Sequence, residues 1–173
     1  MRLKIKIIEE CGYDQALIGL SFNKNQDPKN MPNVAKKLAK KDGGHNKFLE
    51  SICVWIEIDA PRYFWAEFDT YRVGMTKQSQ STMHTITKQP LTQNNFEEEL
   101  PAEFLVELNK LILKKDLVKL KSYLPEGFMQ KRMICTNYKT LRNIIQQRRS
   151  HKLPHWRAFC VEILLQVKNP ELL

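Results

Sequence analysis

The chain is short of the residues that cross-link small folds and of long apolar runs. Its four cysteines are scattered without a Cys-x-x-Cys pair, so the sequence suggests neither a metal site nor a disulfide framework. No apolar run approaches membrane-spanning length, and residues 1–10 alternate lysine with leucine and isoleucine instead of forming the centre of a signal peptide. There is no internal repeat and no low-complexity tail. We therefore expect a cytoplasmic protein that is not associated with a membrane.

Acidic residues are also in short supply. The sequence has 28 Lys and Arg against 19 Asp and Glu, which gives a formal net charge of +9. This excess favours anionic partners such as nucleotides, nucleic acid or acidic surfaces, and charge alone does not choose among them. With 42% hydrophobic residues, a chain of 173 residues is long enough to build one full core. We expect a single domain over residues 1–173.

The most unusual pattern lies near the C-terminal end. At 3.6 residues per turn, one stripe of a predicted helix carries Leu141, Ile144 and Ile145. Asn137 begins this stripe and Arg148 ends it, so an apolar face has an amide at one end and a guanidinium at the other. Because a guanidinium keeps its charge, an inward Arg148 must meet an anionic group. The alternative is that Arg148 lies near the helix C-terminus, where the macrodipole favours it, and extends to water.

The remaining segments follow simpler patterns. Strands are predicted at residues 3–8, 53–59 and 128–135. The first predicted helix follows Asp14, which would cap it. Further helices are predicted from residue 45, after Pro101, and at residues 33–40, 62–71, 117–123, 136–149 and 154–167. Residues 75–85 are dense in hydroxyl and amide side chains, which predicts either a mobile surface loop or a lining that donates hydrogen bonds to a ligand. Residues 88–100 are predicted as a polar connector.

Several of these residues also match a known family. After Leu124-Pro125, the chain carries Asn137, Lys139, Asn143 and Arg148 in an order and spacing that resemble the flavin-dependent thymidylate synthases. His45, Glu50, Ala60-Pro61, Arg72 and Ser81 extend this resemblance over roughly residues 45–148. The resemblance implies an α+β fold with a central, mostly antiparallel sheet flanked by helices.

The resemblance assigns roles to individual residues. It implies that Arg148 is catalytic, because in the family this arginine contacts the pyrimidine ring of dUMP and helps to polarise it. The implied flavin-binding residues are His45, Lys47, Tyr71, Arg72, Asn137, Lys139 and Asn143. The implied nucleotide-binding residues are Glu67, Thr70, Ser79, Gln80, Ser81, Met83 and Lys121, together with Arg148.

The sequence also departs from the family pattern. Thr70-Tyr71-Arg72 stands where the family has Arg-His-Arg, so only the last arginine is kept. Met83 replaces an expected arginine, and Lys121 replaces another. A lysine keeps the charge of an arginine but loses its two-pronged hydrogen bonding. Except for Tyr71, these departures concern the nucleotide side of the implied site.

The implied activity is one-carbon transfer to C5 of dUMP, followed by reduction, to give dTMP. The resemblance implies FAD as cofactor, NADPH and methylenetetrahydrofolate as co-substrates, and a homotetramer whose active sites are shared between chains. Two alternatives stay open. The altered arginine positions are compatible with a pyrimidine nucleotide hydroxymethylase of the same fold, and the charge of +9 is compatible with a non-catalytic protein that binds nucleotides or, less expected, nucleic acid.

Overall fold

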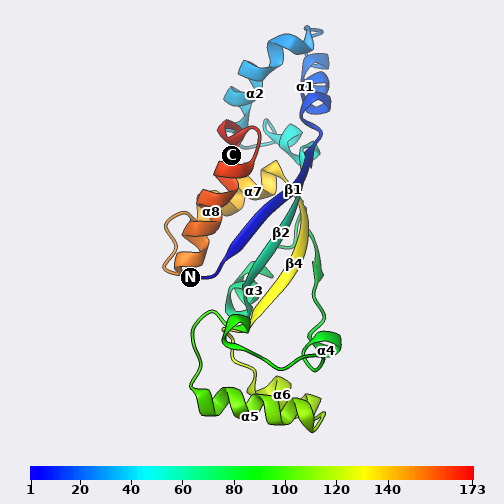
Figure 1. The fold of residues 1–173 in the computed structure, drawn as a ribbon. Helices are drawn as coiled ribbons and strands as arrows, with labels where there is room; N and C mark the ends of the chain where they lie inside the picture. The colour runs from blue at the N-terminus through cyan, green and yellow to red at the C-terminus, as the bar shows by residue number, and fades with distance from the viewer. The chain divides into compact units, whose positions relative to one another are not determined.

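The regular structure of the chain is a four-stranded antiparallel sheet with eight α-helices (Figure 1). The computed structural model describes residues 1–173. The strands are β1 (Lys4–Cys11), β2 (Cys53–Pro61), β3 (Thr76–Ser79) and β4 (Met129–Asn137), and their order in the sheet is β1-β2-β4-β3. The α-helices are α1 (Tyr13–Phe22), α2 (Met31–Ala39), α3 (Arg62–Phe68), α4 (Thr82–Thr85), α5 (Ala102–Leu113), α6 (Leu117–Tyr123), α7 (Tyr138–Arg148) and α8 (Pro154–Gln166). The predicted α+β class with a central antiparallel sheet is confirmed.

Four short 3-10 helices complete the secondary structure. They are η1 (Pro28–Asn30), η2 (Lys47–Ser51), η3 (Gln93–Asn95) and η4 (Pro170–Leu172). The helix predicted from residue 45 is therefore only the short η2, which ends where β2 begins. None of the helices has both the length and the apolar character that a membrane crossing needs.

The chain divides into two compact units. Unit 1 comprises Met1–Lys4, Ile58–Thr70 and Gln78–Arg132. Unit 2 comprises Ile5–Glu57, Tyr71–Lys77 and Met133–Leu173. The boundaries fall within the strands, so β2 and β4 each contribute residues to both units. The expectation of a single domain over the whole chain stays a prediction.

In unit 2, the first helix begins at a glycine and not at the predicted cap. Gly12 is the residue before α1 and has a φ of 94°, in the left-handed region that favours glycine. A Cβ at this position would lie 2.2 Å from the carbonyl oxygen of Ser51, so the close approach of the two backbones also requires glycine. The prediction that Asp14 caps α1 is wrong, because Asp14 lies in the first turn, where its charge is still favourable to the helix dipole.

The core of unit 2 includes the predicted apolar stripe. Leu141, Ile144 and Ile145 of α7 are buried, as are Trp156 and Phe159 of α8. The two helices pack against each other (Figure 1). The helix predictions for residues 136–149 and 154–167 are confirmed, because the 3.6-residue period of apolar side chains marks the buried face of each helix.

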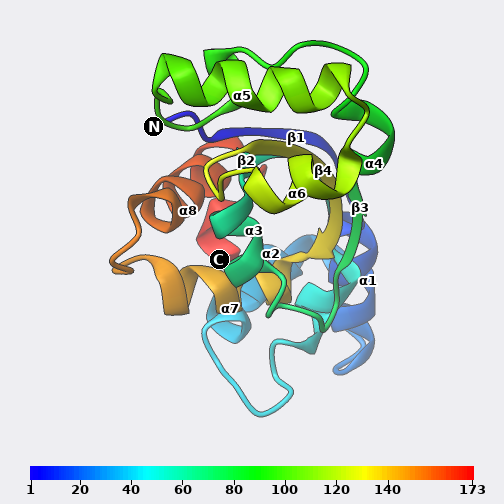
Figure 2. The ribbon, with the colours of Figure 1, turned by 90° about the horizontal axis from the view of Figure 1, so that it is seen from below.

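Unit 1 has its own apolar cluster. It consists of Ile86, Leu91, Phe96, Leu108, Leu111, Ile112, Leu120, Leu124 and Phe128. Helices α5 and α6 pack together at this cluster (Figure 2). Two of its members, Leu91 and Phe96, belong to the predicted polar connector, so that prediction is wrong in part. The neighbouring Glu97 is also buried, and it accepts a hydrogen bond of 2.9 Å from the backbone N–H of Arg2.

Residues 75–85 contain regular structure that the sequence did not predict. They form β3 and the one-turn helix α4, and the backbone N–H of Gln80 donates to the carbonyl of Lys131 at 2.9 Å. A strand without branched aliphatic residues gives no periodic apolar signal. This segment forms a strand because it pairs with β4, although its composition does not predict one.

Candidate functional site

The segment after Thr70 is held against the beginning of α7. Thr136 Oγ1 donates a hydrogen bond of 3.0 Å to the carbonyl oxygen of Gly74. Gly74 has a φ of 66°, and a Cβ there would lie 2.6 Å from Thr140 Oγ1 and 2.9 Å from Asn137 Nδ2. Only glycine lets the chain pass so close to the helix in this conformation. This contact places Tyr71, at the start of the same segment of unit 2, alongside α7.

Asn137 caps α7 instead of starting its inward face. Its Oδ1 accepts a hydrogen bond of 2.9 Å from the backbone N–H of Thr140, which satisfies one of the free N–H groups at the helix start. Because the carbonyl end of the side chain is used in this way, the amide nitrogen is the end that can donate to a ligand. The prediction that Asn137 lies on the buried stripe is wrong, but its position beside Gly74 keeps it at the candidate site.

Two further predicted flavin-binding residues line a pocket in unit 2. The pocket has a volume of about 620 Å³, and His45 and Lys47 lie on its wall together with Leu20, Leu38 and Phe48. Its wall thus combines apolar side chains with a cation and an imidazole, which suits a flat ring that carries anionic groups. Both predicted residues are exposed, so a ligand can reach them.

An ion pair connects this region to α7. Lys139 Nζ lies 2.9 Å from Glu50 Oε1, and the two residues are 89 positions apart in the sequence. Glu50 belongs to η2, the element that contains Lys47. The pair is partly exposed and contributes little to stability. The pair holds η2, which contains Lys47, beside α7, which contains Lys139 and Asn143, and so brings predicted flavin-binding residues of both elements together.

Arg148 lies against two aromatic rings. Its Cζ is 4.6 Å from the ring centre of Trp156 and 5.5 Å from that of Tyr71. Its Nε donates a hydrogen bond of 2.8 Å to the Tyr71 hydroxyl. Arg148 is the last residue of α7, so the helix dipole also favours its charge. The side chain is half-buried, and its place in the last turn agrees with the alternative prediction, but its guanidinium lies against two rings and does not extend freely into water.

The Tyr71 hydroxyl connects Arg148 to another predicted residue. It donates to Gln147 Oε1 at 2.9 Å, and Gln147 Nε2 donates to Asn143 Oδ1 at 3.1 Å. Asn143 is exposed on α7, and its amide nitrogen is the end that can meet a ligand. Unit 2 thus brings Tyr71, Asn143 and Arg148 into one hydrogen-bonded group.

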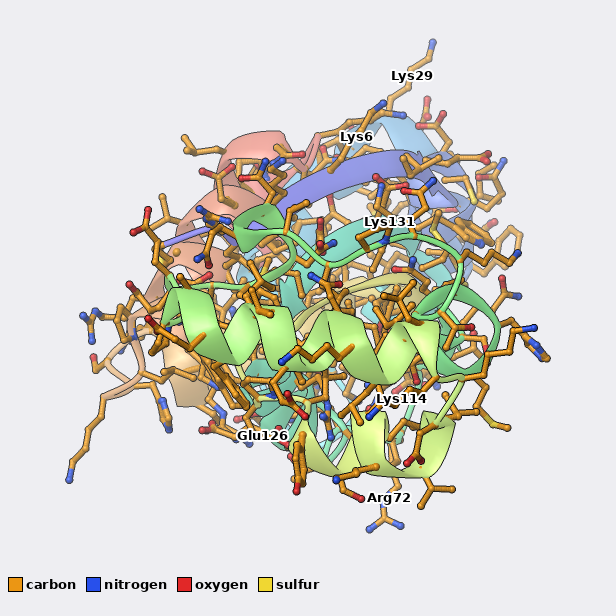
Figure 3. All side chains as sticks on the ribbon, turned by 60° about the horizontal axis from the view of Figure 1, so that its bottom comes forward. Lys6, Lys29, Arg72, Lys114, Glu126 and Lys131 are labelled. Carbon is orange, nitrogen blue, oxygen red and sulfur yellow. The ribbon has the colours of Figure 1, made fainter.

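The predicted residues are divided between the two units. Unit 2 holds His45, Lys47, Tyr71, Arg72, Asn137, Lys139, Asn143 and Arg148, which are the predicted flavin-binding and catalytic residues. Unit 1 holds Glu67, Thr70, Ser79, Gln80, Ser81, Met83 and Lys121, which are predicted to bind the nucleotide. The Arg72 side chain is exposed and extends away from the ribbon (Figure 3). In unit 1, Met83 on α4 and Lys121 on α6 are exposed as well.

Several residues that shape the site are not among the predicted site residues. In unit 2 these residues are Gly74, Gln147 and Trp156, which lie at the contacts of Asn137, Tyr71 and Arg148. In unit 1, Arg132 donates to both carboxylate oxygens of Asp69, at 2.8 and 3.0 Å, and its Cζ lies 4.4 Å from the ring centre of Trp65. A glycine between polar segments is a signal that could have pointed to Gly74. The other partners depend on contacts between distant parts of the chain.

Comparison with known proteins identifies the fold. No family model and no curated protein matches the sequence. A crystal structure of thymidylate synthase X (ThyX) from Helicobacter pylori with FAD and dUMP matches with a TM-score of 0.78 and 16% identity, over 98% of this chain and 95% of that one. A second structure of the flavin-dependent thymidylate synthase ThyX from Helicobacter pylori, complexed with FAD and dUMP, matches with a TM-score of 0.78 and 15% identity, over 98% and 97% of the two chains. The chain therefore has the fold of the flavin-dependent thymidylate synthase ThyX.

Proposed function

We propose that this protein is a flavin-dependent enzyme that transfers a one-carbon unit to C5 of dUMP and reduces it, giving dTMP. The observation that carries the proposal is the grouping of Asn137, Lys139, Asn143 and Arg148 along one helix, in a chain with the ThyX fold. The Helicobacter pylori structures with this fold contain FAD and dUMP. Fold and residue pattern are separate observations, because the pattern is a property of the sequence and the fold is a property of the backbone.

The side chains of unit 2 fit a planar, anionic cofactor such as FAD. Four side chains would donate hydrogen bonds to its phosphate and ring oxygens. They are the amide groups of Asn137 and Asn143, the ammonium of Lys139 and the guanidinium of Arg72. The pocket beside Lys47 provides apolar walls for a flat ring. When bound and reduced by NADPH, the flavin would supply the hydride that converts the methylene unit from methylenetetrahydrofolate into the methyl group of dTMP.

Arg148 would act on the nucleotide by its charge. A guanidinium near the pyrimidine would stabilise negative charge on its N3–C4 region, which makes C5 a better nucleophile toward the one-carbon unit. Cysteine is not proposed as a nucleophile. Burial raises the pKa of Cys160 to about 11 and also raises the pKa of Cys53, so both thiols stay protonated and weakly nucleophilic near neutral pH.

The nucleotide-binding residues of unit 1 are part of the same proposal. Ser81 and Lys121 would hold the phosphate through charge-assisted hydrogen bonds. Glu67, Thr70, Ser79, Gln80 and Met83 are proposed as further nucleotide contacts.

A homotetramer is the assembly that we propose, because the family builds its active sites from several chains. Exposed apolar side chains on two helices support assembly, namely Ile18 and Phe22 on α1 and Val161 and Leu165 on α8. Phe22 and Leu165 are 75% and 74% exposed. Contact with further copies of the chain would remove this apolar surface from water.

A pyrimidine nucleotide hydroxymethylase is the second candidate. The observation that favours it is the exposed Met83, together with Thr70, at positions where the family has arginine. A site with fewer cations on the nucleotide side is compatible with a changed reaction at the same carbon.

Product analysis separates the two candidates. The protein would be incubated with FAD, NADPH, methylenetetrahydrofolate and dUMP, and the nucleotides would be resolved by liquid chromatography and mass spectrometry. We expect dTMP, which would rule out the hydroxymethyl product. A hydroxymethylated nucleotide would favour the second candidate, and unchanged dUMP in a protein that retains FAD would contradict both.

A further inference from the structure

We propose that Tyr71 is a positioning residue for Arg148, and that its hydroxyl connects Arg148 to the flavin-binding side of α7. This inference rests on the proposed function, in which Arg148 acts on the nucleotide. It also changes the role of Tyr71, which the family resemblance assigns to direct contact with the flavin.

In the hydrogen-bonded group around Tyr71, each residue donates to the next, from Arg148 through Tyr71 and Gln147 to Asn143. An arginine Nε–H can only donate, so the Tyr71 oxygen is the acceptor of the 2.8 Å bond from Arg148. The hydroxyl proton is then directed to Gln147 Oε1 at 2.9 Å. This fixes the orientation of the Gln147 amide, whose nitrogen donates to Asn143 Oδ1 at 3.1 Å. With the amide reversed, both neighbours of the Tyr71 oxygen would be donors, and the Gln147 oxygen would face the Asn143 oxygen.

Two aromatic rings lie against the guanidinium. Trp156 is buried, and Phe159 packs against it with ring centres 5.8 Å apart. The rings of Tyr71 and Trp156 are 5.7 Å apart at an angle of 68°, and Arg148 lies over both of them. A guanidinium that stacks on a ring has fewer orientations available than one that is only paired by charge.

Together these contacts restrain Arg148 at three points. The helix fixes its backbone, Tyr71 binds its Nε, and Trp156 restricts the plane of its guanidinium. A group that stabilises charge in a transition state acts best when it is already oriented, because no reorganisation is then needed during the reaction. Removing the Tyr71 hydroxyl would loosen this orientation without altering the rings.

The first experiment measures the orientation of Arg148 without any catalytic assay. In a ¹⁵N-labelled protein, the Arg148 Nε–H signal is assigned by its loss in Arg148→Lys. We expect slow exchange with water and an upfield ring-current shift in the wild type, and exchange at least tenfold faster in Tyr71→Phe. An Arg148 signal that exchanges as fast as that of the exposed Arg149 would overturn the proposal.

The second experiment compares kcat, KM and FAD affinity in two variants. Tyr71→Phe keeps the ring and should lower kcat by roughly ten- to a hundredfold, the value of a hydrogen bond to a charged group, while FAD affinity and the unfolding midpoint stay unchanged. Gln147→Glu keeps the acceptor for the Tyr71 hydroxyl but cannot donate to Asn143, so kcat should change less than threefold while FAD affinity falls. A merely structural role would not separate these two quantities. Tyr123→Phe, in an exposed tyrosine of unit 1, is the control and should match the wild type.

The outcomes distinguish the two proposals. If Tyr71→Phe lost FAD affinity in parallel with kcat, Tyr71 would be a flavin ligand and the positioning role would be overturned. A kcat within twofold of the wild type would overturn it too. The wild-type protein could have no turnover while its Arg148 Nε–H exchanges slowly with water and exchanges faster in Tyr71→Phe. In that case the proposed function would fail, but the positioning of Arg148 by Tyr71 would stand.

Discussion

The hydroxyl of Tyr138 lies 2.6 Å from Glu10 Oε1, although 128 residues separate them in the sequence. Both side chains are buried, and the second carboxylate oxygen accepts a hydrogen bond of 2.9 Å from the backbone N–H of Lys168. The backbone N–H of Asn169 donates to the Tyr138 oxygen at 3.1 Å. A buried carboxylate needs such donors, since it would otherwise be costly to remove from water. This group joins β1, α7 and the chain after α8 within unit 2.

We therefore expect Tyr138→Phe to destabilise the protein. The change removes a donor from the buried Glu10 carboxylate while keeping the ring, and it should lower the free energy of unfolding by about 2 kcal/mol. Urea denaturation followed by circular dichroism measures this. Tyr123→Phe is the matched control, because Tyr123 is 44% exposed, and it should change stability by less than about 0.5 kcal/mol. Equal midpoints for the two variants would contradict the role of this group.

The same residue predicts how stability depends on alkaline pH. Burial, and then the hydrogen bond to Glu10, raise the pKa of Tyr138 above its ordinary value of 10.0. Above pH 10 the unfolded chain therefore loses this proton before the folded chain does, and the free energy of unfolding falls as the pH rises. We expect a smaller decline in Tyr138→Phe than in the wild type when urea midpoints are compared between pH 9 and pH 11. Parallel curves for the two proteins would show that Tyr138 does not contribute.

Gly74→Ala tests the close approach of the chain to α7. The alanine Cβ would meet Thr140 and Asn137 at less than 3.0 Å, and its φ of 66° would add backbone strain. Gly43→Ala is the control, because Gly43 has a similar φ of 72° but nothing within 4 Å of its Cβ position. We expect Gly43→Ala to cost about 1 kcal/mol of unfolding free energy, from the left-handed backbone alone, and Gly74→Ala to cost more. Equal losses would mean that the contact at Gly74 is not tight.

Asn143→Ala should weaken FAD binding. The change removes the amide that we propose as a flavin contact and shortens the hydrogen-bonded group that begins at Arg148, so the dissociation constant should rise about fivefold, equivalent to about 1 kcal/mol. Titration with FAD, followed by the quenching of flavin fluorescence, gives this value. Gln146→Ala, at an exposed position of the same helix, is the control. An unchanged affinity in Asn143→Ala would mean that the alignment with the family is shifted.

Arg148→Ala should separate cofactor binding from turnover. FAD affinity should be largely kept, whereas kcat should fall by a factor of about 100 to 1,000, the usual effect of removing one charge-stabilising donor. The neighbouring Arg149→Ala removes an exposed arginine and should leave kcat within twofold of the wild type. Equal activity in Arg148→Ala would remove Arg148 from the mechanism.

Local patterns in the sequence predicted the helices well. The stripe of Leu141, Ile144 and Ile145 in α7 is set by the 3.6-residue period, which depends only on neighbours along the chain. The same reasoning placed Trp156 on the buried face of α8. Capping was less predictable, because Asp14 had the right chemistry for a cap but Gly12 alone fits beside Ser51. Whether a residue caps a helix depends here on a backbone that arrives from another part of the chain.

Contacts between distant residues account for what the sequence did not predict. The hydrogen bond between Arg148 and Tyr71 spans 77 positions, and no periodic pattern relates the two. The strand β3 has no apolar alternation and exists because it pairs with β4. Glu97 lies in the predicted polar connector, but it is buried, and its carboxylate is paired with the N–H of Arg2 and with the N-terminal ammonium at 3.8 Å. The family resemblance supplied the site residues that physical patterns alone did not select.

The visible absorbance spectrum of the protein tests most directly whether this fold holds a flavin. The protein would be measured as purified, and again after incubation with excess FAD followed by desalting. We predict a flavin spectrum that survives desalting with about one FAD per chain, and a weaker one in Asn143→Ala. A wild-type protein that is colourless after desalting would contradict the account, and its basic surface would then favour a non-catalytic protein that binds nucleotides or nucleic acid.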